Sequence, residues 1–590
     1  MDLHIVGAEP SEAERAAVDR LLGPPVSGWG GGERDIARDG RAAVGGRSLT
    51  GDRDRLLPAL HAVQDAMGWI SRGALNYICR RLTVPPAEAW GVVTFYHLLA
   101  TEPQSGNIAH VCDDIACRLH GLDTQIADLT SQGFTVKRSP CLGQCDYGAA
   151  ALITRAGKDP QRFVVKPAVV PHLGALGAAR LLKRIGRVDP SSLDEYRRHG
   201  GYSALAKAIE MGPARVIAEV TAAKLMGRGG AAFPTGRKWE AVARESSYPH
   251  YVVCNADESE PGTFKDRVVM EQDPFAVIEA MTICGFATGA ARGFIYIRGE
   301  YPEAERAIGH AIAQAAAAGY LGPDIARSGF AFGIEIRRGG GAYICGEETA
   351  LFNSIEGKRG EPRSKPPFPA QSGLFGKPTV VNNVETLVNV LDIVNEGGEA
   401  WANSGTPAST GSRLFCLSGH VVNPGLYEIE CGRTLREAIE LAGGIHPGRR
   451  LQAVLLGGAA GTFVGPDALD MPLSFEGARA AGATLGSGVI MVFDDTADLH
   501  DTLRRIAEFF KHESCGQCVP CRVGTVRQLE MLSASAGGAR VADRTYAELA
   551  QAMRDASICG LGQTAASAIE SAFANVLRPR PEDPNSGGHV

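Results

Sequence analysis

Residues 251–263 read YVVCNADESEPGT, an apolar run followed by a polar loop. The run Tyr251–Cys254 is β-prone and predicts a buried strand. One amide and three carboxylates follow at once, at Asn255, Asp257, Glu258 and Glu260. Ligand sites in α/β folds form where strands end. This stretch therefore predicts an α/β domain with a binding site at the end of this strand.

The same pattern extends outward along the chain. Further strand-like runs lie at Gly293–Ile297 and Ile334–Arg337, each followed by a loop and a helical pattern. A dense glycine loop, GRGGAAFPTG at 227–236, precedes the first strand. Glycines let backbone N–H groups approach phosphate oxygens closely. The loop departs from the dinucleotide fingerprint, because a helix-like stretch at Val216–Leu225 precedes it instead of a strand.

Three more stretches of the same region carry ligand-type residues. GGGAYICGEET at 339–349 is a second glycine loop leading into a helix. KPPFP at 365–369 supplies a cation and an aromatic ring, and TVVNNVE at 379–385 supplies two adjacent amides. Four such stretches in one domain favour a nucleotide or flavin site over unrelated surface loops.

Two sets of clustered cysteines lie outside this domain. Cys112 and Cys117 form C-x4-C, and Cys141 and Cys145 form C-x3-C. Each pair follows a predicted strand, at Asn107–Val111 and Phe134–Ser139, so both pairs are expected at one edge of a sheet. Four thiolates suit a 2Fe–2S cluster or a zinc ion, and spacing alone does not separate the two.

The second set is ESCGQCVPCR at 513–522, with a distant cysteine in a later segment. Cys515, Cys518 and Cys521 form C-x2-C-x2-C, and Cys559 follows after 37 residues. Three close cysteines and a distant fourth are typical of a 4Fe–4S cluster. Zinc is the alternative, although zinc usually binds paired knuckles.

Composition excludes several classes of function. The 590 residues are enough for several domains, 44% of them are hydrophobic, and the net charge of −6 gives no basic field for nucleic acid. No apolar run approaches the ~20 residues of a membrane span, and Met1-Asp2-Leu3-His4 does not begin a secretory signal. We therefore expect a cytoplasmic protein in which most of the 14 cysteines stay reduced.

These motifs carry a resemblance to a known family. The region from about 213 to 578 closely resembles the NADH-oxidising flavoprotein subunit of respiratory complex I, through GRGGAAFPTGRKW, NADESEPGTFKDR, GAYICGEETAL, KPPFPA, VNNVET and ESCGQCVPCR. Residues 50–175 resemble its companion thioredoxin-like 2Fe–2S subunit, which here precedes it in the same chain. The resemblance implies one FMN, NAD, one 4Fe–4S and one 2Fe–2S cluster.

The resemblance also implies site residues. The metal ligands are the eight cysteines at 112, 117, 141, 145, 515, 518, 521 and 559. The FMN candidates are Gly227, Gly229, Lys238, Asn255, Asp257, Glu258, Tyr343, Gly346, Glu347, Asn382 and Asn383, with Arg228, Gly230 and Thr379 completing the cofactor set. The NADH candidates are Phe233, Glu260, Glu348, Lys365 and Phe368. Hydride transfer is the work of FMN, so no side chain is assigned as catalytic.

Ala232 and Gly340 depart from the family pattern, since many relatives have glycine and alanine there. Both residues are small, so we expect the FMN and NADH pocket to keep its shape.

The predicted architecture is multidomain α/β and α+β. We expect a flexible arm (1–50), a helical bundle (51–105), a thioredoxin-like 2Fe–2S domain (106–175), a linker (176–212), a Rossmann-like FMN/NADH domain (213–408), a β-grasp domain (409–496), a helical 4Fe–4S domain (497–578) and a polar tail (579–590). Whatever its partner, the chain is interpreted as a NADH:acceptor oxidoreductase, or diaphorase, acting within a hetero-oligomer without direct membrane insertion.

The sequence leaves the partner open. The stretch Met553–Gln563 looks most like β subunits of NAD-dependent formate dehydrogenases, which implies a catalytic α subunit with a molybdenum or tungsten pterin and further clusters. The alternatives are the diaphorase component of a NAD-reducing hydrogenase and a complex I-type module. A zinc-stabilised scaffold is a hypothesis from a different class. The reduction potentials, the direction, the stoichiometry, and whether the 2Fe–2S cluster lies on the main electron route are also open.

Overall fold

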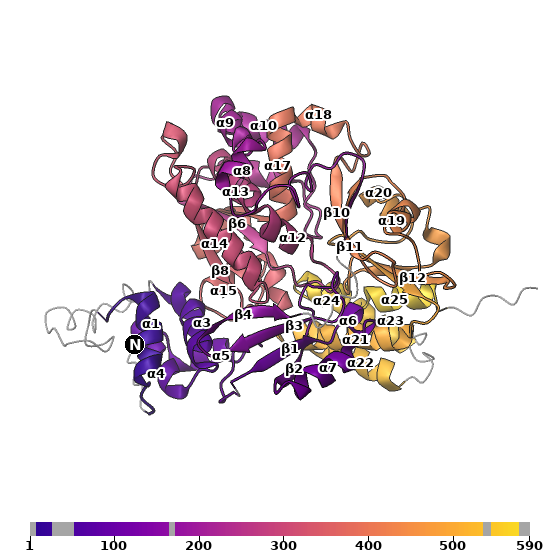
Figure 1. Cartoon of the computed structure of the whole chain (residues 1–590), viewed down its shortest axis with the longest axis horizontal. Helices are drawn as coiled ribbons and strands as arrows, with labels where there is room; N and C mark the ends of the chain where they lie inside the picture. Colours follow the sequence, from indigo (N-terminus) through magenta and orange to yellow (C-terminus); the bar gives the residue numbers. More distant parts are fainter. Residues whose placement is uncertain (1–6, 26–51, 105, 164–171, 535–543, 578–590) are drawn as a thin grey trace, which may run out of the picture.

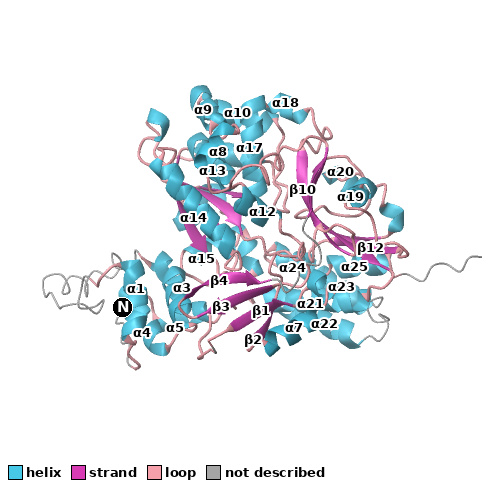
Figure 2. Cartoon of the chain, in the orientation of Figure 1, coloured by secondary structure: helices cyan, strands magenta, loops and turns pink. Residues whose placement is uncertain are grey.

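A computed structural model describes residues 7–25, 52–104, 106–163, 172–534 and 544–577. Figure 1 shows N-terminal helices on one side, a small sheet beside them, a large α/β unit above, and the C-terminal helices beside the small sheet. Figure 2 shows the strands gathered into sheets with helices packed around them, and a group of helices without strands at the N-terminal side. In the described residues, no helix is long and apolar enough to cross a membrane.

The N-terminal region is a helical bundle. Its elements are α1 (Glu12–Leu22), η1 (Arg53–Arg55), α3 (Leu56–Met67), α4 (Arg72–Leu82) and α5 (Pro86–Val93). The expectation of a flexible arm is wrong for 12–22. Ser11 and Glu14 form a capping box, and Val18 is buried against the bundle. Residues 1–6 and 26–50 of that prediction lie outside the described residues.

A four-stranded mixed sheet follows, in the order β2-β1-β3-β4. Its elements are β1 (Ile108–Cys112), α6 (Ile115–Arg118), α7 (Leu122–Ser131), β2 (Thr135–Ser139), β3 (Ala151–Arg155) and β4 (Lys158–Phe163). β1 pairs parallel with β2 and antiparallel with β3. The predicted strands are present within one to two residues at each end, and both cysteine pairs follow strands at one edge of this sheet.

The expected linker is built into the neighbouring units. β5 (His172–Leu176) pairs parallel with β11 of a later sheet, although residues up to 175 were expected in the 2Fe–2S domain. Beyond it lie α8 (Leu193–Arg198) and α9 (Ser203–Met211). The buried carboxylate of Glu279 accepts hydrogen bonds from the Tyr196 hydroxyl and from the amides of Tyr202 and Leu205. A buried charge needs such partners, so this segment is fixed against the core.

The central unit is a parallel sheet in the order β8-β7-β6-β9. Its strands are β6 (His250–Ala256), β7 (Ala290–Ile297), β8 (Gly333–Arg338) and β9 (Thr379–Asn383). The helices and turns are α10 (Pro213–Ala222), α11 (Thr235–Ala243), α12 (Lys265–Gln272), α13 (Pro274–Thr288), α14 (Pro302–Ala317), η2 (Ile325–Arg327), η3 (Tyr343–Gly346), α15 (Glu348–Ile355), α16 (Pro369–Ser372), η4 (Leu374–Gly376), α17 (Val384–Glu396) and α18 (Gly398–Ala402). α13 is mostly apolar and almost wholly buried, with the bonded Glu279 carboxylate as its one charged group.

A six-stranded sheet, in the order β13-β12-β14-β10-β11-β5, forms the next unit. Its elements are β10 (Ser412–Gly419), β11 (Gly425–Glu430), α19 (Leu435–Leu441), β12 (Leu451–Leu456), β13 (Thr462–Val464), η5 (Pro466–Ala468), α20 (Phe475–Ala480) and β14 (Val489–Asp494). The chain ends in helices, as predicted: α21 (Leu499–Glu513), α22 (Val519–Ala534), α23 (Arg544–Ala556), α24 (Gly560–Thr564) and α25 (Ser567–Asn575). The expected tail at 579–590 lies outside the described residues.

The docking of α1 gives a first prediction. A Cβ built on Gly73 would lie 2.2 Å from the carbonyl oxygen of Glu9, so Gly73→Ala must push the segment before α1 away from α4. Overpacking of this kind costs about 1–3 kcal/mol. We expect faster amide hydrogen exchange across residues 12–22.

Gly91→Ala on α5 is the matched control. A Cβ there meets only the Arg359 side chain, at 3.7 Å, and alanine favours the helix. Equal exchange rates across α1 in the two variants would contradict the packing described here.

Candidate functional site

The loops that leave the parallel sheet meet at one edge. Asn255, at the end of β6, donates from Nδ2 to the carbonyl oxygen of Gly346, at 2.8 Å. A Cβ on Gly229 would lie 3.0 Å from that of Asn383, so the first glycine loop packs on the end of β9. The structure thus brings together the loops in which four separate sequence stretches placed ligand residues.

One buried oxygen at this edge has no protein partner in the described residues. Asp257 Oδ2 is buried and accepts no hydrogen bond. Burial raises the pKa of Asp257 well above its usual value. An unpaired buried carboxyl oxygen is costly, so a polar ligand that donates to it fits this place. The hydroxyl-rich side chain of a flavin nucleotide is such a ligand.

The outer rim carries exposed rings and paired charges. Phe233 and Phe368 are 51% and 56% exposed. Lys365 Nζ lies 3.0 Å from Glu347 and 2.8 Å from Glu348. Lys238 Nζ is 3.7 Å from Glu348, donates to the Val381 carbonyl and lies over the Phe233 ring. Exposed aromatic faces beside a charged rim suit the stacking of a planar nucleotide.

Tyr343 connects this edge with the C-terminal helices. Its hydroxyl donates to Glu260 at 2.5 Å, and its amide donates to Glu513 at 2.8 Å. Ala460, from the six-stranded sheet, donates to the other oxygen of Glu260. Burial raises the pKa of Glu260 to about 7 and that of Glu513 to about 7.

Three predicted cofactor residues have other roles in the structure. Thr379 begins β9, level with Tyr251, and therefore lies at the opposite edge of the sheet. The Arg228 guanidinium is buried against the carbonyls of Thr410 and Ser412, and only its amide faces the β9–α17 turn. The sequence predicted that both side chains bind the cofactor. In the structure, Arg228 is bonded to other parts of the protein and Thr379 lies away from the site.

Glu258 is the third. Its carboxylate accepts from the amides of Asp266 and Arg267 at the start of α12 and from the Tyr301 hydroxyl. Burial raises the pKa of Glu258 to about 8. The carboxylate is thus already engaged, so any contact with FMN falls to the backbone of this residue.

The other candidates stay at the edge or beside it. The side-chain oxygen of Asn382 accepts from the Trp239 indole N–H at 2.8 Å, and Glu347 caps α15 with one oxygen. Gly227 bonds back to Phe233, which closes the glycine loop, and Gly230 has open space around its Cβ direction. Ala232 has φ +51°, a left-handed conformation that explains the glycine of many relatives.

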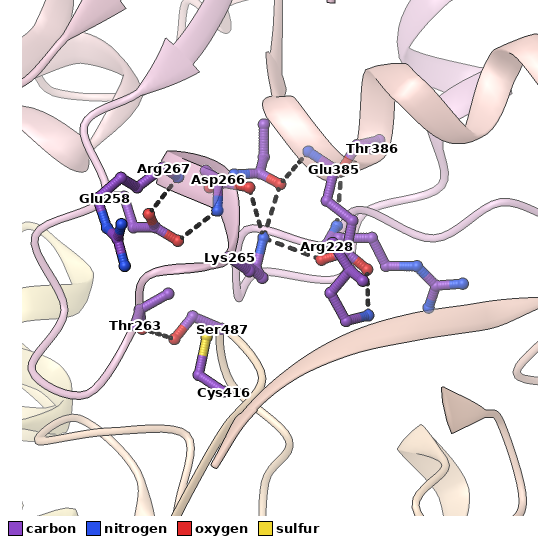
Figure 3. Close-up of polar contacts among 12 residues, drawn as sticks. Arg228, Glu258, Thr263, Lys265, Asp266, Arg267, Glu385, Thr386, Cys416 and Ser487 are labelled. Carbon is purple, nitrogen blue, oxygen red and sulfur yellow. Dashed lines mark hydrogen bonds and ion pairs between the residues drawn. The ribbon is translucent and has the colours of Figure 1, made fainter. Parts of the chain in front are cut away.

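Lys265 is a buried residue that sequence reasoning missed (Figure 3). Its ammonium lies 2.8 Å from Asp266, 2.9 Å from Glu385 and 3.2 Å from the side-chain oxygen of Asn383. Burial alone would lower the pKa of Lys265, but Asp266 and Glu385 more than offset it, so the pKa is raised. The DESEPGTFKDR stretch predicts ligand contacts, and nothing in its sequence indicates a buried ion pair.

The four cysteines of the first set, at 112, 117, 141 and 145, are all buried. Cys141 Sγ and Cys145 Sγ are 3.6 Å apart. Hydrogen bonds from Cys112 and Cys145, with further support from Arg298 and the Gly262 amide, hold the pKa of Cys141 well below its usual value. No three His, Cys, Asp or Glu side chains in the described ranges are arranged around one metal-ion position. A 2Fe–2S cluster instead spreads four thiolates over two irons, and this donor set fits it.

The loop that bears Cys141 and Cys145 docks on the flavin edge. Arg267 donates to both oxygens of Asp146 at 2.6–2.7 Å and to the Gly143 carbonyl at 3.0 Å. Arg298 donates to the Cys141 carbonyl at 2.5 Å. A Cβ on Gly143 would lie 1.9 Å from Tyr301 Oη, so only glycine allows this approach. Arg298 and Asp146 lie outside the quoted motifs, and nothing in NADESEPGTFKDR indicates this contact of Arg267.

The second set of cysteines lies between α21 and α24. Cys515 and Cys518 are on the loop after α21, Cys521 is on α22, and Cys559 caps α24. Burial raises the pKa of Cys521 to about 11 and that of Cys559 to about 12, while the amides of Leu561 and Gly562 act against the rise at Cys559. Amides that favour the thiolate in this way fit an anionic cluster.

A separate cavity of about 280 Å³ holds none of the predicted FMN or NAD residues. It lies where α3, the small sheet and the end of β8 meet, and its lining includes His61, Lys137 and Arg338. Asp65 pairs with Arg338 there, and Gln104 with Lys137.

Family models match four parts of the chain. They are the thioredoxin-like [2Fe-2S] ferredoxin (46–159), the Nuo51 FMN-binding domain (220–392), the SLBB domain (413–484) and the NADH-ubiquinone oxidoreductase-F iron–sulfur binding region (501–576). The F 2 component of the NADH-quinone oxidoreductase of Rhizobium meliloti is 46% identical over 67% of this chain and 94% of its own length. The chain belongs to the NADH-quinone oxidoreductase F family. Its predicted multidomain fold and its FMN, 2Fe–2S and 4Fe–4S cofactors are thereby confirmed.

Other relatives come from hydrogenases. The HndC component of the NADP-reducing hydrogenase of Solidesulfovibrio fructosivorans is 42% identical over 69% of this chain and 84% of its own. A crystal structure of NAD+-reducing [NiFe]-hydrogenase matches with a TM-score of 0.75 and 32% identity, covering 88% of this chain and 92% of that chain. This member of the family is thus a NADH-binding oxidoreductase component of the diaphorase type, and the family functions in hetero-oligomeric complexes.

The docked cysteine loop gives a second prediction. Arg267→Leu leaves the Asp146 carboxylate buried without its cation, and breaking such a pair costs about 3–5 kcal/mol. We expect increased proteolysis at residues 141–147 and loss of the 2Fe–2S signal, with FMN retained.

Arg292→Leu is the control, because Arg292 is exposed on β7 and its pair with Glu335 is at the surface. Retention of a normal 2Fe–2S signal and of protease resistance in Arg267→Leu would refute the docking role.

Proposed function

We propose that this chain exchanges electrons between NAD(H) and the catalytic subunit of a cytoplasmic NAD-dependent formate dehydrogenase. FMN, when bound, exchanges a hydride with the nicotinamide and passes single electrons to iron–sulfur clusters. The observation that carries the electron route is that loops of one sheet edge touch both cysteine sets. Arg298, directly after β7, donates to the Cys141 carbonyl, and Tyr343 donates to Glu513, two residues before Cys515.

The FMN contacts proposed are those at the sheet edge. They are Gly227, Gly229, Gly230, Lys238, Asn255, Asp257, Tyr343, Gly346, Glu347, Asn382 and Asn383. The NADH contacts proposed are Phe233, Glu348, Lys365 and Phe368, which form the outer rim, and Glu260, which lies partly buried beside Tyr343. The rings of Phe233 and Phe368 would stack on the nucleotide, and water would be excluded between the two reacting rings.

The proposed partner carries a molybdenum or tungsten pterin. The stretch Met553–Gln563 resembles formate dehydrogenase β subunits, and within the described ranges we recognise an NAD and flavin site but no site for a second substrate. The similarity to NAD+-reducing [NiFe]-hydrogenase, over 88% of this chain, favours the second candidate, a hydrogenase partner.

Purification of the native complex through a tag on this chain distinguishes the two. We expect molybdenum or tungsten in the complex, together with formate-dependent NAD reduction. Nickel with hydrogen-dependent NAD reduction and no formate activity would overturn the formate assignment and leave the diaphorase assignment intact.

Glu260 gives a prediction of nucleotide preference. Each oxygen of its carboxylate has one donor, Tyr343 or Ala460, and keeps a second lone pair, so the carboxylate can still accept from ribose hydroxyls and repel a 2′-phosphate. Glu260→Gln should raise the NADPH/NADH ratio of kcat/KM by about tenfold, because hydrogen bonds to charged groups contribute about 1.5 kcal/mol or more. Glu399→Gln, an exposed carboxylate on α18, is the control. An unchanged ratio in Glu260→Gln would count against this role.

The same residue predicts a pH dependence. Burial raises the pKa of Glu260 to about 7, so the carboxylate forms only as the pH rises through that value. If the carboxylate binds ribose, kcat/KM for NADH rises with pH through about 7, since kcat/KM reports the free enzyme. Glu260→Gln should remove this rise. A profile of the same shape in both proteins would assign the titration to another group.

A further inference from the structure

Tyr96 enters the back of the proposed flavin site from the N-terminal helices. It follows α5, in a part of the chain that resembles a separate subunit, and is 1% exposed. A Cβ on Gly340 would lie 2.6 Å from the Tyr96 ring, and one on Gly341 would lie 2.4 Å from the His97 ring. Leu98 donates to the Gly340 carbonyl at 3.1 Å. The glycines after β8, which the sequence indicated as a nucleotide loop, thus admit the N-terminal helices.

The Tyr96 hydroxyl reaches the two elements that follow those glycines. It donates to Ser354 Oγ on α15 at 2.8 Å, and Cys345 Sγ on η3 is 4.0 Å away. Ser354 also bonds to the Tyr296 hydroxyl at 2.8 Å. A Cβ on Gly360 would lie 2.4 Å from Cys345 Sγ, so the thiol is confined between Gly360 and Tyr96. A loss of the hydroxyl leaves space into which η3 can move.

η3 is the segment through which such a movement would reach the site. Gly346, its last residue, accepts the hydrogen bond of Asn255, and Tyr343, its first, donates to Glu260. Asn255 is a proposed FMN contact and Glu260 a proposed NADH contact. The buried Tyr96 hydroxyl therefore packs against the segment that bonds both Asn255 and Glu260.

We propose that Tyr96 is a positioning residue for the FMN and NADH sites, acting through Cys345 and Ser354 on η3 and α15. The fused N-terminal helices then form the rear wall of the flavin site and do more than carry the 2Fe–2S domain. This inference rests on the proposed placement of FMN at the Asn255–Gly346 edge.

The test measures flavin affinity in the full-length chain. FMN is removed and titrated back by its fluorescence, and KM and kcat for NADH are measured with a small acceptor that takes electrons from the flavin. Tyr96→Phe keeps the ring and removes the hydroxyl. We expect FMN to bind about fivefold more weakly and KM for NADH to rise by a similar factor, with kcat little changed, since a net hydrogen bond corresponds to about that ratio.

Ser354→Ala approaches the same bond from the other side. If Tyr96 and Ser354 act together, the double variant Tyr96→Phe/Ser354→Ala binds FMN no more weakly than the weaker of the two single variants. Thr94→Ala is the control, because Thr94 is exposed near Tyr96 and its hydroxyl bonds only to the Trp90 carbonyl. Its FMN affinity should equal that of the original chain.

Unchanged FMN affinity and NADH KM in Tyr96→Phe, or fully additive losses in the double variant, would overturn the inference even if the melting temperature falls. Asn255→Ala separates this failure from a failure of the proposed site. If Asn255→Ala weakens FMN binding and Tyr96→Phe does not, only the role of Tyr96 is lost. If Asn255→Ala leaves FMN binding unchanged, the placement of the flavin itself is wrong.

Discussion

A buried ammonium group holds the central edge of this protein together. Lys265 has no exposed surface, and a charge in that position is tolerated only with close partners of opposite charge. Asp266 and Glu385 supply them, from α12 and from the first turn of α17. Glu385 also accepts the amide of Leu414 on β10, so the same network joins the flavin domain to the six-stranded sheet.

The segment from Asp257 to Arg267 therefore contacts several neighbouring units of the structure. Thr263 bonds to Ser487 and Phe264 donates to Cys416, both on the six-stranded side, while Arg267 holds the loop of the first cysteine set. Electron transfer needs closely spaced centres, and it needs them at fixed positions. This loop is bonded to α17, to the six-stranded sheet and to the first cysteine loop. Buried contacts of this kind hold the centres at fixed positions better than surface ion pairs do.

The sequence predicted the parts of the site that depend on local chemistry. Cysteine spacing identified both cluster sets, and polar residues after strands located the sheet edge. It could not assign Glu258, Thr379 or Arg228, whose side chains are occupied by α12, η4 and β10, contacts made between distant segments. The expected linker and arm failed for the same reason, because buried partners such as Glu279 order residues that show little periodicity. Arg298 and Tyr96 carried no motif, and only the packed structure reveals what they touch.

The central claim is that one chain holds a flavin and two different clusters around a single sheet edge. Its most direct measurement is the metal and flavin content of the purified full-length chain, with low-temperature paramagnetic resonance after reduction by NADH. We expect one FMN, about six iron atoms and two distinct iron–sulfur signals, of which Cys521→Ser abolishes one and Cys141→Ser the other. A colourless chain that contains zinc and no iron would contradict this claim.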